Sequence, residues 1–247
     1  MMLQKKKILV LGANSDIARA LCEGFAQQGA LLHLVSRDKS ELEKTAQDLR
    51  IRYGCTVQTS ILDALSGASR QTIIDELDPQ LDGVVVAFGI LGSQEKAQEH
   101  EDLREQILQA NFNAAVHLLE PIAALFEQRR TGFIIGLSSV AGDRGRASNY
   151  LYGAAKAGFS AYLSGLRNRL SKANVQVLTV KPGFVKTKMT LGLPLPGKLV
   201  ATPEQVAHDI QQALAKKSDV LYTRWFWKYL MLIIIHIPER IFKRMSL

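Results

Sequence analysis

Tyr152 and Lys156 are the residues whose types and spacing are best suited to proton transfer in this sequence. They stand four residues apart in a segment with a helical pattern, so both side chains lie on one face and can touch a common ligand. A lysine ammonium close to a tyrosine stabilises the phenolate, and we therefore expect the pKa of Tyr152 to be lowered. Ser139 closes an apolar run thirteen residues before Tyr152. Because ligands bind beyond the carboxyl ends of parallel strands, the serine and the tyrosine are expected to meet at one place.

Two neighbouring hydroxyl groups are the alternatives for these roles. Ser138 adjoins Ser139, but the thirteen-residue spacing to Tyr152 favours Ser139. Tyr150 is a second tyrosine in the same segment, but its six-residue spacing to Lys156 does not place the two on one helical face.

A turn near the N-terminus could cradle a phosphate. Gly12 follows an apolar run and permits a tight turn, after which the free N–H groups of a helix would face an anion. Where a full glycine fingerprint has further glycines, this chain has Asp16 and Ala18. Ala18 still allows close helix–strand packing, whereas Asp16 brings a charge near the phosphate unless it turns away as a helix cap. The residues expected at this cradle are Gly12, Asn14, Ser15, Asp16 and Ile17.

The second apolar run ends in Ser36, which is followed by Arg37 and Asp38. A guanidinium at this place can pair with a 2′-phosphate and lie against an adenine, so Arg37 favours NADP. Asp38 keeps NAD as the alternative, because an acid at this strand end accepts from the ribose hydroxyls. Asp63 ends the third apolar run and is suited to accept from the adenine amino group.

Short apolar runs alternate with helical stretches along the chain. The expected strands cover 8–12, 31–36, 56–62, 84–88, 133–138, 175–180 and 220–223. The expected helices cover 15–28, 39–50, 69–77, 103–126 (bent near Pro121), 152–172 and 203–216. This alternation predicts the α/β class: one domain with a doubly wound, seven-stranded parallel sheet and helices on both faces.

With these motifs in place, the span from about 7 to 223 resembles the short-chain dehydrogenase/reductase family. Its Rossmann fold agrees with the expected sheet. The spacing of Ser139, Tyr152 and Lys156 carries the resemblance, and Asn111 matches the family's asparagine in the fourth helix. The Pro-Gly loop of the family corresponds to Pro182, Gly183, Val185 and Thr187, of which the threonine closes on the cofactor. The run Ala87-Phe88-Gly89 stands where the family has Asn-Ala-Gly, so Ala87 replaces the asparagine whose side chain helps to fix the turn after the fourth strand, and Gly89 is kept.

The resemblance implies four catalytic roles. Tyr152 is the general acid to a carbonyl in reduction, or the base to an alcohol in oxidation. Lys156 lowers the pKa of that tyrosine and holds the nicotinamide ribose. Ser139 hydrogen-bonds the reacting oxygen, and Asn111 holds a water that links Lys156 to solvent. A homodimer or homotetramer through the helices at 103–126 and 152–172 is also implied.

Composition restricts the remaining classes. The 247 residues are 47% hydrophobic and 22% charged, which excludes a disordered or fibrous chain. Two distant cysteines give neither a disulfide framework nor a metal spacing, so a reducing compartment and no metal are expected. No secretory signal is recognised, because the apolar run after Lys7 is broken at Gly12. Of the net charge of +8, residues 1–10 carry +3 and 224–247 carry +4, which leaves the body nearly neutral and argues against a nucleic-acid partner.

The segment 224–247 is expected to be a helical tail beside a domain at 1–223. Its run 225–237 is apolar except for Lys228 and His236, but as a helix it would span only about 20 Å of the roughly 30 Å bilayer core. The basic residues beyond Pro238 favour an interfacial helix, and packing against the substrate mouth or a partner subunit is the alternative. The expected location is the cytoplasm, with peripheral attachment to the inner face of the membrane through this tail.

The substrate is less well defined by the sequence. An apolar loop at 189–200 is a candidate lid, which suits a hydrophobic substrate, although core packing explains it equally. Short elements at 15–17, 88–92 and in the tail resemble the branch containing decaprenylphosphoryl-ribose 2-keto reductases, which implies a lipid-linked keto sugar. Two other functions stay open: a nucleotide-binding scaffold without turnover, which Asp16 and Ala87 favour, and a nucleotide-sugar epimerase or dehydratase, for which the chain is short.

Overall fold

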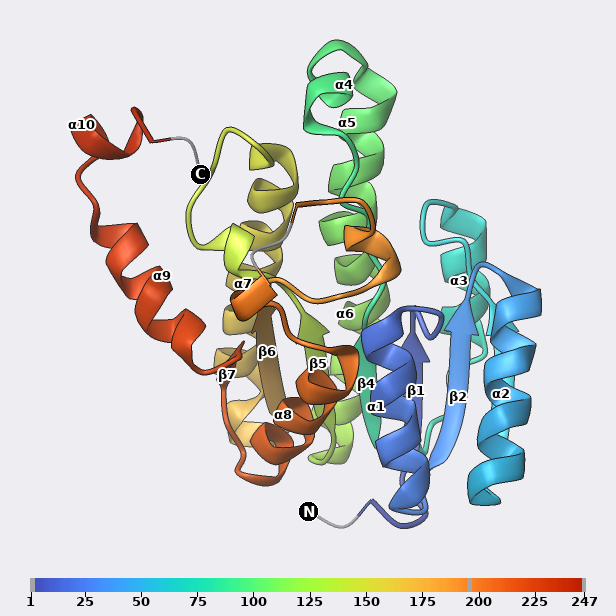
Figure 1. The fold of residues 1–247 in the computed structure, drawn as a ribbon. Coiled ribbons are helices and arrows are strands. Elements are labelled where there is room, and N and C mark those ends of the chain that lie inside the picture. The colour runs from blue at the N-terminus through green and yellow to red at the C-terminus, as the bar shows by residue number, and fades with distance from the viewer. Residues whose placement is uncertain (1–2, 195–196, 246–247) are drawn as a thin grey trace.

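One parallel sheet forms the centre of the protein (Figure 1). The computed structural model describes residues 3–194 and 197–245, and within them seven strands follow the order β3-β2-β1-β4-β5-β6-β7. Their bounds are β1 Lys7–Leu11, β2 Leu31–Ser36, β3 Val57–Ile61, β4 Gly83–Val86, β5 Phe133–Leu137, β6 Gln176–Pro182 and β7 Val220–Thr223. The strand order reverses direction between β1 and β4, so a crevice opens there beyond the carboxyl ends of the strands. The predicted α/β class and single sheet are confirmed.

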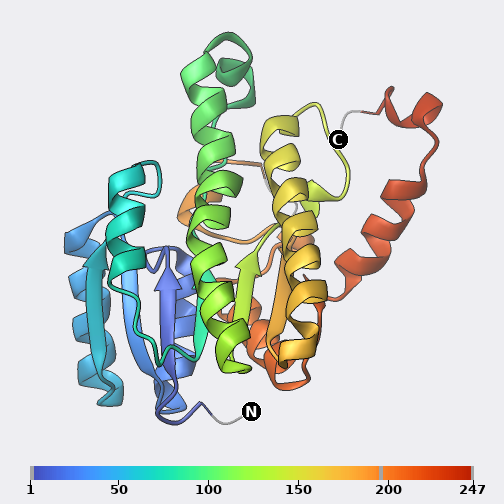
Figure 2. The same ribbon diagram turned by 180° about the vertical axis from the view of Figure 1, so that it is seen from behind.

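Helices cover both faces of the sheet, as Figures 1 and 2 show from opposite sides. One face carries α1 (Asp16–Gln27), α2 (Lys39–Tyr53) and α8 (Pro203–Ala215), and the other carries α3 (Gly67–Asp75), α6 (Ala114–Arg129) and α7 (Tyr150–Leu170). The strand side chains alternate between the two cores. In β1, Ile8 and Val10 join the first core, whereas Leu9 and Leu11 join the second. All four are almost fully buried, which explains why the strand reads as a continuous apolar run.

The long helix expected at 103–126 is interrupted, and not at the place predicted. Helix α5 (Glu101–Leu108) passes into a π-helical turn at Gln109–Asn113 before α6 begins. Pro121 lies inside α6, which continues through it. A further short helix, α4 (Gln94–Glu99), was not anticipated; its cap Ser93 accepts a hydrogen bond from the Lys96 N–H at 3.3 Å. Asn111 lies buried in this turn, and π-helical turns inside longer helices occur frequently at functional sites.

The C-terminal tail forms α9 (Phe226–His236) and α10 (Glu239–Phe242), and α9 runs outwards from the end of β7 (Figure 1). Its inner side is anchored, because Trp227 and Met231 are buried in a small core with Val140. Arg144 donates to the carbonyl oxygens of Ile234, Ile235 and Ile237. The tail therefore packs against the domain that contains the sheet. In the described ranges we find no helix with the length and apolarity that crossing a bilayer requires.

Candidate active site

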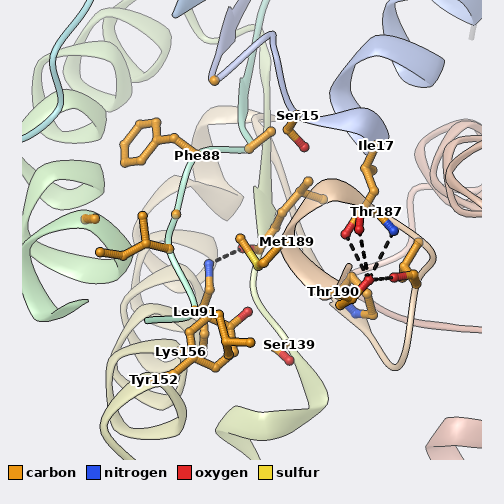
Figure 3. A pocket seen from close by; sticks show the side chains of 18 of the residues that line it. Ser15, Ile17, Phe88, Leu91, Ser139, Tyr152, Lys156, Thr187, Met189 and Thr190 are labelled. Carbon is orange, nitrogen blue, oxygen red and sulfur yellow. Dashed lines mark hydrogen bonds between the residues drawn. The ribbon is translucent and has the colours of Figure 1, made fainter. Parts of the chain in front are cut away.

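A cavity of about 660 Å³ lies beyond the carboxyl ends of the strands. Every residue predicted to bind the cofactor lines it, and Ser139 does too. Figure 3 shows Tyr152, Lys156 and Ser139 gathered in one part of the cavity, while Ile17 and Thr187 lie in another. The predicted lining residues are Gly12, Asn14, Ser15, Asp16, Ile17, Arg37, Asp63, Ala87, Gly89, Ser139, Tyr152, Lys156, Pro182, Gly183, Val185 and Thr187. Of the predicted site residues, Asn111 alone does not line the cavity, because its side chain is buried behind the residues that do.

Tyr152 and Lys156 occupy one face of α7, as their spacing predicts, and the Lys156 Nζ lies 5.7 Å from the centroid of the Tyr152 ring. The ammonium donates to the Leu137 carbonyl oxygen at 2.9 Å. Burial lowers the pKa of Lys156 to about 8. The expected lowering of the Tyr152 pKa is wrong for this state of the protein. Burial of the phenol raises its pKa to about 12, against a smaller opposing effect of Ser139.

The two adjacent serines have different partners. Ser139 follows β5, its Oγ accepts from the Ala141 N–H at 3.1 Å, and its hydroxyl is also a hydrogen-bond partner of the Tyr152 side chain. Ser138 is buried, and its hydroxyl donates to the Lys156 carbonyl oxygen at 2.9 Å and lies 2.7 Å from the Ser160 hydroxyl. The preference for Ser139 over Ser138 agrees with these contacts, because Ser138 holds β5 against α7.

Asn111 lies in the π-helical turn and is 1% exposed. Its amide group donates to the Ile90 carbonyl oxygen at 2.7 Å and to the Ile107 carbonyl oxygen at 2.8 Å. The Oδ1 atom has no partner. A Cβ on Gly89 would stand 2.5 Å from that oxygen and 3.5 Å from the Lys156 Nζ, so only glycine allows this close approach. The orphaned oxygen and the ammonium thus face the same small space.

The nucleotide end is formed by the turn after β1. Gly12 has φ +88°, and a Cβ there would overlap the backbone of Phe88. Asn14 donates from its amide group to the Asp38 carbonyl oxygen at 2.9 Å, and its own Oδ1 is buried without a partner. The Asp38 carboxylate accepts from the Glu41 N–H at 3.1 Å and caps α2. Arg37 is exposed at the rim of the cavity, so the cation at this strand end is available while the acid caps a helix.

The segment after β6 closes one side of the cavity. Thr187 and Thr190 form a capping box, in which the Thr190 hydroxyl accepts from the Thr187 N–H at 3.1 Å. The same hydroxyl donates to the Val185 carbonyl oxygen at 2.7 Å. Asp16 turns towards this segment, and its carboxylate accepts from the Lys188 N–H at 2.7 Å. The predicted apolar loop contributes Met189 and Leu193 to the cavity wall. Residues 195–196 of that loop lie outside the described residues.

Several lining residues were not predicted from the sequence. Arg146 and Asn149 line the cavity, and the Arg146 Nε and the Asn149 Oδ1 are buried without a hydrogen-bond partner. Both residues fall between Ser139 and Tyr152 in the chain. Because both ends of that interval reach the cavity, polar side chains within it were candidates for the wall, and this signal could have identified them.

The fold and the residues that line this cavity are those of a dinucleotide-dependent oxidoreductase, and the comparisons with known proteins agree. The family model for short chain dehydrogenase matches residues 6–194, so the chain belongs to the short-chain dehydrogenase/reductase family and is an NAD(P)-dependent oxidoreductase. It is 32% identical over 241 residues to an uncharacterized oxidoreductase of Mycobacterium tuberculosis, with 96% of each chain covered.

Solved structures show the same fold. A short-chain dehydrogenase from Sphingobium yanoikuyae in complex with NADPH superposes with a TM-score of 0.85 at 24% identity, covering 95% of this chain and 97% of that one. A bulky-bulky ketone specific alcohol dehydrogenase from Comamonas testosteroni superposes with a TM-score of 0.81 at 23% identity and covers 95% of both chains. These identities are low, so the likeness concerns the fold.

Proposed function

We propose that this protein reduces a ketone, or oxidises the corresponding secondary alcohol, with NADP(H). The observation that carries this proposal is the meeting of Ser139, Tyr152 and Lys156 at one cavity that also contains the nucleotide turn. When bound, the dinucleotide supplies or accepts the hydride. The protein holds the reacting carbonyl and moves its proton.

Two buried polar atoms without a partner support a bound dinucleotide and a water beside it. The Asn14 Oδ1 is buried beside the Gly12 turn, where helix N–H groups and polar side chains would meet the phosphates. The Asn111 Oδ1 faces the space beside Lys156, which suits a water joining the two. A buried polar atom without a partner indicates a ligand or a water at that place. The residues that line the cavity therefore fit a bound dinucleotide.

The catalytic side chains have different tasks in this proposal. Tyr152 donates a proton to the carbonyl oxygen, and its raised pKa keeps it protonated near neutral pH, which suits reduction. Ser139 donates a hydrogen bond from its hydroxyl to the same oxygen and keeps its proton. Lys156 holds the nicotinamide ribose and, through the water at Asn111, returns a proton to Tyr152.

We infer NADP rather than NAD from the end of β2. Arg37 is exposed at the cavity rim and can form a charge-assisted pair with a 2′-phosphate. The competing carboxylate of Asp38 caps α2 and is less available to a ribose. The similar dehydrogenase from Sphingobium yanoikuyae was solved in complex with NADPH, in agreement with this choice.

A hydrophobic or lipid-linked substrate, and a membrane beside it, are the finer part of the proposal. The cavity wall includes the apolar side chains of Leu91, Met189 and Leu193. Trp225, the cap residue before α9, and Ile233 on α9 are 69% and 65% exposed, while basic residues follow in and after α10. Such a helix suits the interface of an anionic bilayer. We also propose that two copies associate through α5–α6 and α7, as the family suggests.

An assay of NADPH consumption with a panel of apolar ketones tests the function. We expect Tyr152→Phe to bind NADPH with unchanged affinity but to lose activity by about 100-fold or more, because a general acid contributes at least that factor. Ser138→Ala is the matched control, since this serine holds β5 against α7. Undiminished turnover of Tyr152→Phe would remove the tyrosine from its role. Failure to bind either dinucleotide, measured by nicotinamide fluorescence, would contradict the function as a whole.

A further inference from the structure

Arg146 lines the cavity without a counter-ion. Its Nε is buried, and its guanidinium makes no hydrogen bond or ion pair with the residues in 3–194 and 197–245. Arg144, two residues earlier in the same loop, is the opposite case. It donates to three carbonyl oxygens of the tail, pairs with Glu239 at 2.9 Å and lies 3.7 Å from the centroid of the Phe242 ring. Arg144 thus stabilises the contact between this loop and the tail, whereas Arg146 makes no such contact.

A half-buried guanidinium without a partner is costly to the folded protein. Arginine remains charged in proteins, so it cannot avoid the cost of desolvation by losing its proton. Burial lowers the pKa of Arg146, and no carboxylate compensates for it. The nearby Asn149 Oδ1 is buried without a partner as well. Unpaired polar groups lining one cavity indicate that a ligand supplies the missing partners.

The position of Arg146 assigns it to the substrate rather than to the dinucleotide. It stands seven residues after Ser139 and six before Tyr152, the two residues proposed to hold the reacting carbonyl. Arg37, proposed for the 2′-phosphate, follows β2, and β1 and β4 separate β2 from β5. At about 4.8 Å per strand, these carboxyl ends are roughly 14 Å apart. Arg146 belongs to the segment that joins β5 to α7, on the side of the sheet that carries Ser139 and Tyr152, so we assign it to the substrate and not to the 2′-phosphate.

We propose that Arg146 is a specificity-determining residue that binds an anionic group, a carboxylate or a phosphate, on the ketone substrate. A guanidinium pairs with either group through two parallel hydrogen bonds. Leu91, Phe184 and Leu193 line the same cavity and suit an apolar remainder of the substrate. The substrate class is then an amphiphilic ketone with an anionic group close to the carbonyl. This inference rests on the proposed ketone reduction and names its substrate class.

Affinity for a matched pair of ketones tests the inference without turnover. The probes are 5-oxo-5-phenylpentanoate and its primary amide, titrated by calorimetry into the protein loaded with NADP⁺, which cannot reduce them. We expect the acid to bind wild type at least tenfold more tightly than the amide, a difference of about 1.4 kcal/mol. In Arg146→Gln the ratio should fall towards one, and Arg146→Lys should retain part of it. Lys188→Gln is the control, because Lys188 lines the cavity but pairs with Glu41 at 3.0 Å; its ratio should match that of wild type.

The outcomes separate this inference from the proposed function. Equal affinities of acid and amide, no measurable binding of either, or a ratio that survives in Arg146→Gln would each overturn the role of Arg146. Ketone reduction with NADPH would still support the function in those cases. Conversely, an Arg146-dependent preference without hydride transfer to any ketone would support the anion site and contradict the function. The corresponding phosphonate distinguishes the two anions: tighter binding than that of the acid indicates a phosphorylated substrate, and weaker binding a keto acid.

Discussion

The carboxylate of Asp16 accepts a hydrogen bond of 2.7 Å from the backbone N–H of Lys188, which joins the first residue of α1 to the segment after β6. Asp16 occupies a position where a glycine fingerprint has no side chain. The contact explains the departure, because the carboxylate points to the closing segment. The Lys188 ammonium adds a second link, to Glu41 on α2.

Loss of the Asp16 contact should loosen this segment. We expect trypsin to cleave after Lys186 several-fold faster in Asp16→Ala than in wild type, because a charge-assisted hydrogen bond is lost. Asp16→Asn keeps an acceptor oxygen and should be intermediate. Glu41→Gln, which removes only the side-chain link, serves as the control. The measurement is the rate of appearance of this fragment by mass spectrometry, and equal rates in Asp16→Ala and wild type would show that the contact does not restrain the segment.

The burial of Lys156 has a consequence for stability against pH. Its pKa is about 8 in the folded protein and near the ordinary 10.5 when unfolded, so the unfolded chain binds more protons between these values. The free energy of unfolding should therefore rise with pH from 8 upwards, while below pH 8 the full cost, on the order of 3 kcal/mol, is present. Tyr152 has the opposite effect only as pH approaches its unfolded pKa of 10, because its folded pKa is raised to about 12, and this effect is common to wild type and a variant at Lys156.

Lys156→Met lacks this ionisation and provides the comparison. As pH rises from 8 to 10, the free energy of unfolding of wild type should increase, whereas that of Lys156→Met should lack this increase. The variant should therefore become less stable relative to wild type, which urea denaturation at each pH measures. Loss of the Lys156–Leu137 hydrogen bond adds a constant that does not depend on pH. The matched control is Lys172→Met, since Lys172 is exposed. A difference for Lys156→Met that stays constant over this range would contradict the burial of an ionisable ammonium.

Cofactor choice should depend on Arg37. We expect NADPH to bind at least tenfold more tightly than NADH, which corresponds to about 1.4 kcal/mol. Arg37→Ala should bring that ratio towards one, because the 2′-phosphate loses its charge-assisted partner. Fluorescence titration of both dinucleotides measures it, with Lys39→Ala, an exposed neighbour, as the control. An unchanged ratio would mean that specificity lies elsewhere.

The outer side of the tail should hold the protein on anionic vesicles. We expect the full chain to sediment with them, with partial release by salt, because each basic residue near such a surface contributes about 1 kcal/mol. Replacement of Lys228, Arg240, Lys243 and Arg244 by Glu should reduce sedimentation and leave reduction of a small ketone unchanged. Truncation after Thr223 is a poor test, since it removes the buried Trp227 and Met231. Should the protein ignore vesicles while Ile233→Glu breaks a dimer, the tail is an oligomer contact.

The sequence was sufficient for the sheet and for most of the site. Buried strands such as 8–12 are apolar without interruption, and Tyr152 and Lys156 depend on helical spacing alone, so both could be predicted locally. The π-helical turn around Asn111 could not, because the bond from its side chain to the Ile90 carbonyl oxygen is a tertiary contact. The pKa of Tyr152 was predicted in the wrong direction for the same reason: spacing indicates neighbours, whereas burial depends on the whole fold.

The indole of Trp227 on α9 packs so closely on Gly183 that a Cβ on this glycine would overlap the ring, and Gly183 lines the cavity. Helix α9 therefore packs directly on a residue of the cavity wall. If a surface that holds α9 changes the affinity for the dinucleotide, thermodynamic reciprocity requires that the dinucleotide change the affinity for that surface by the same factor. Occupancy of the cavity would then be communicated to the outside of the molecule, and lipid composition would set the cofactor concentration at which the cavity fills.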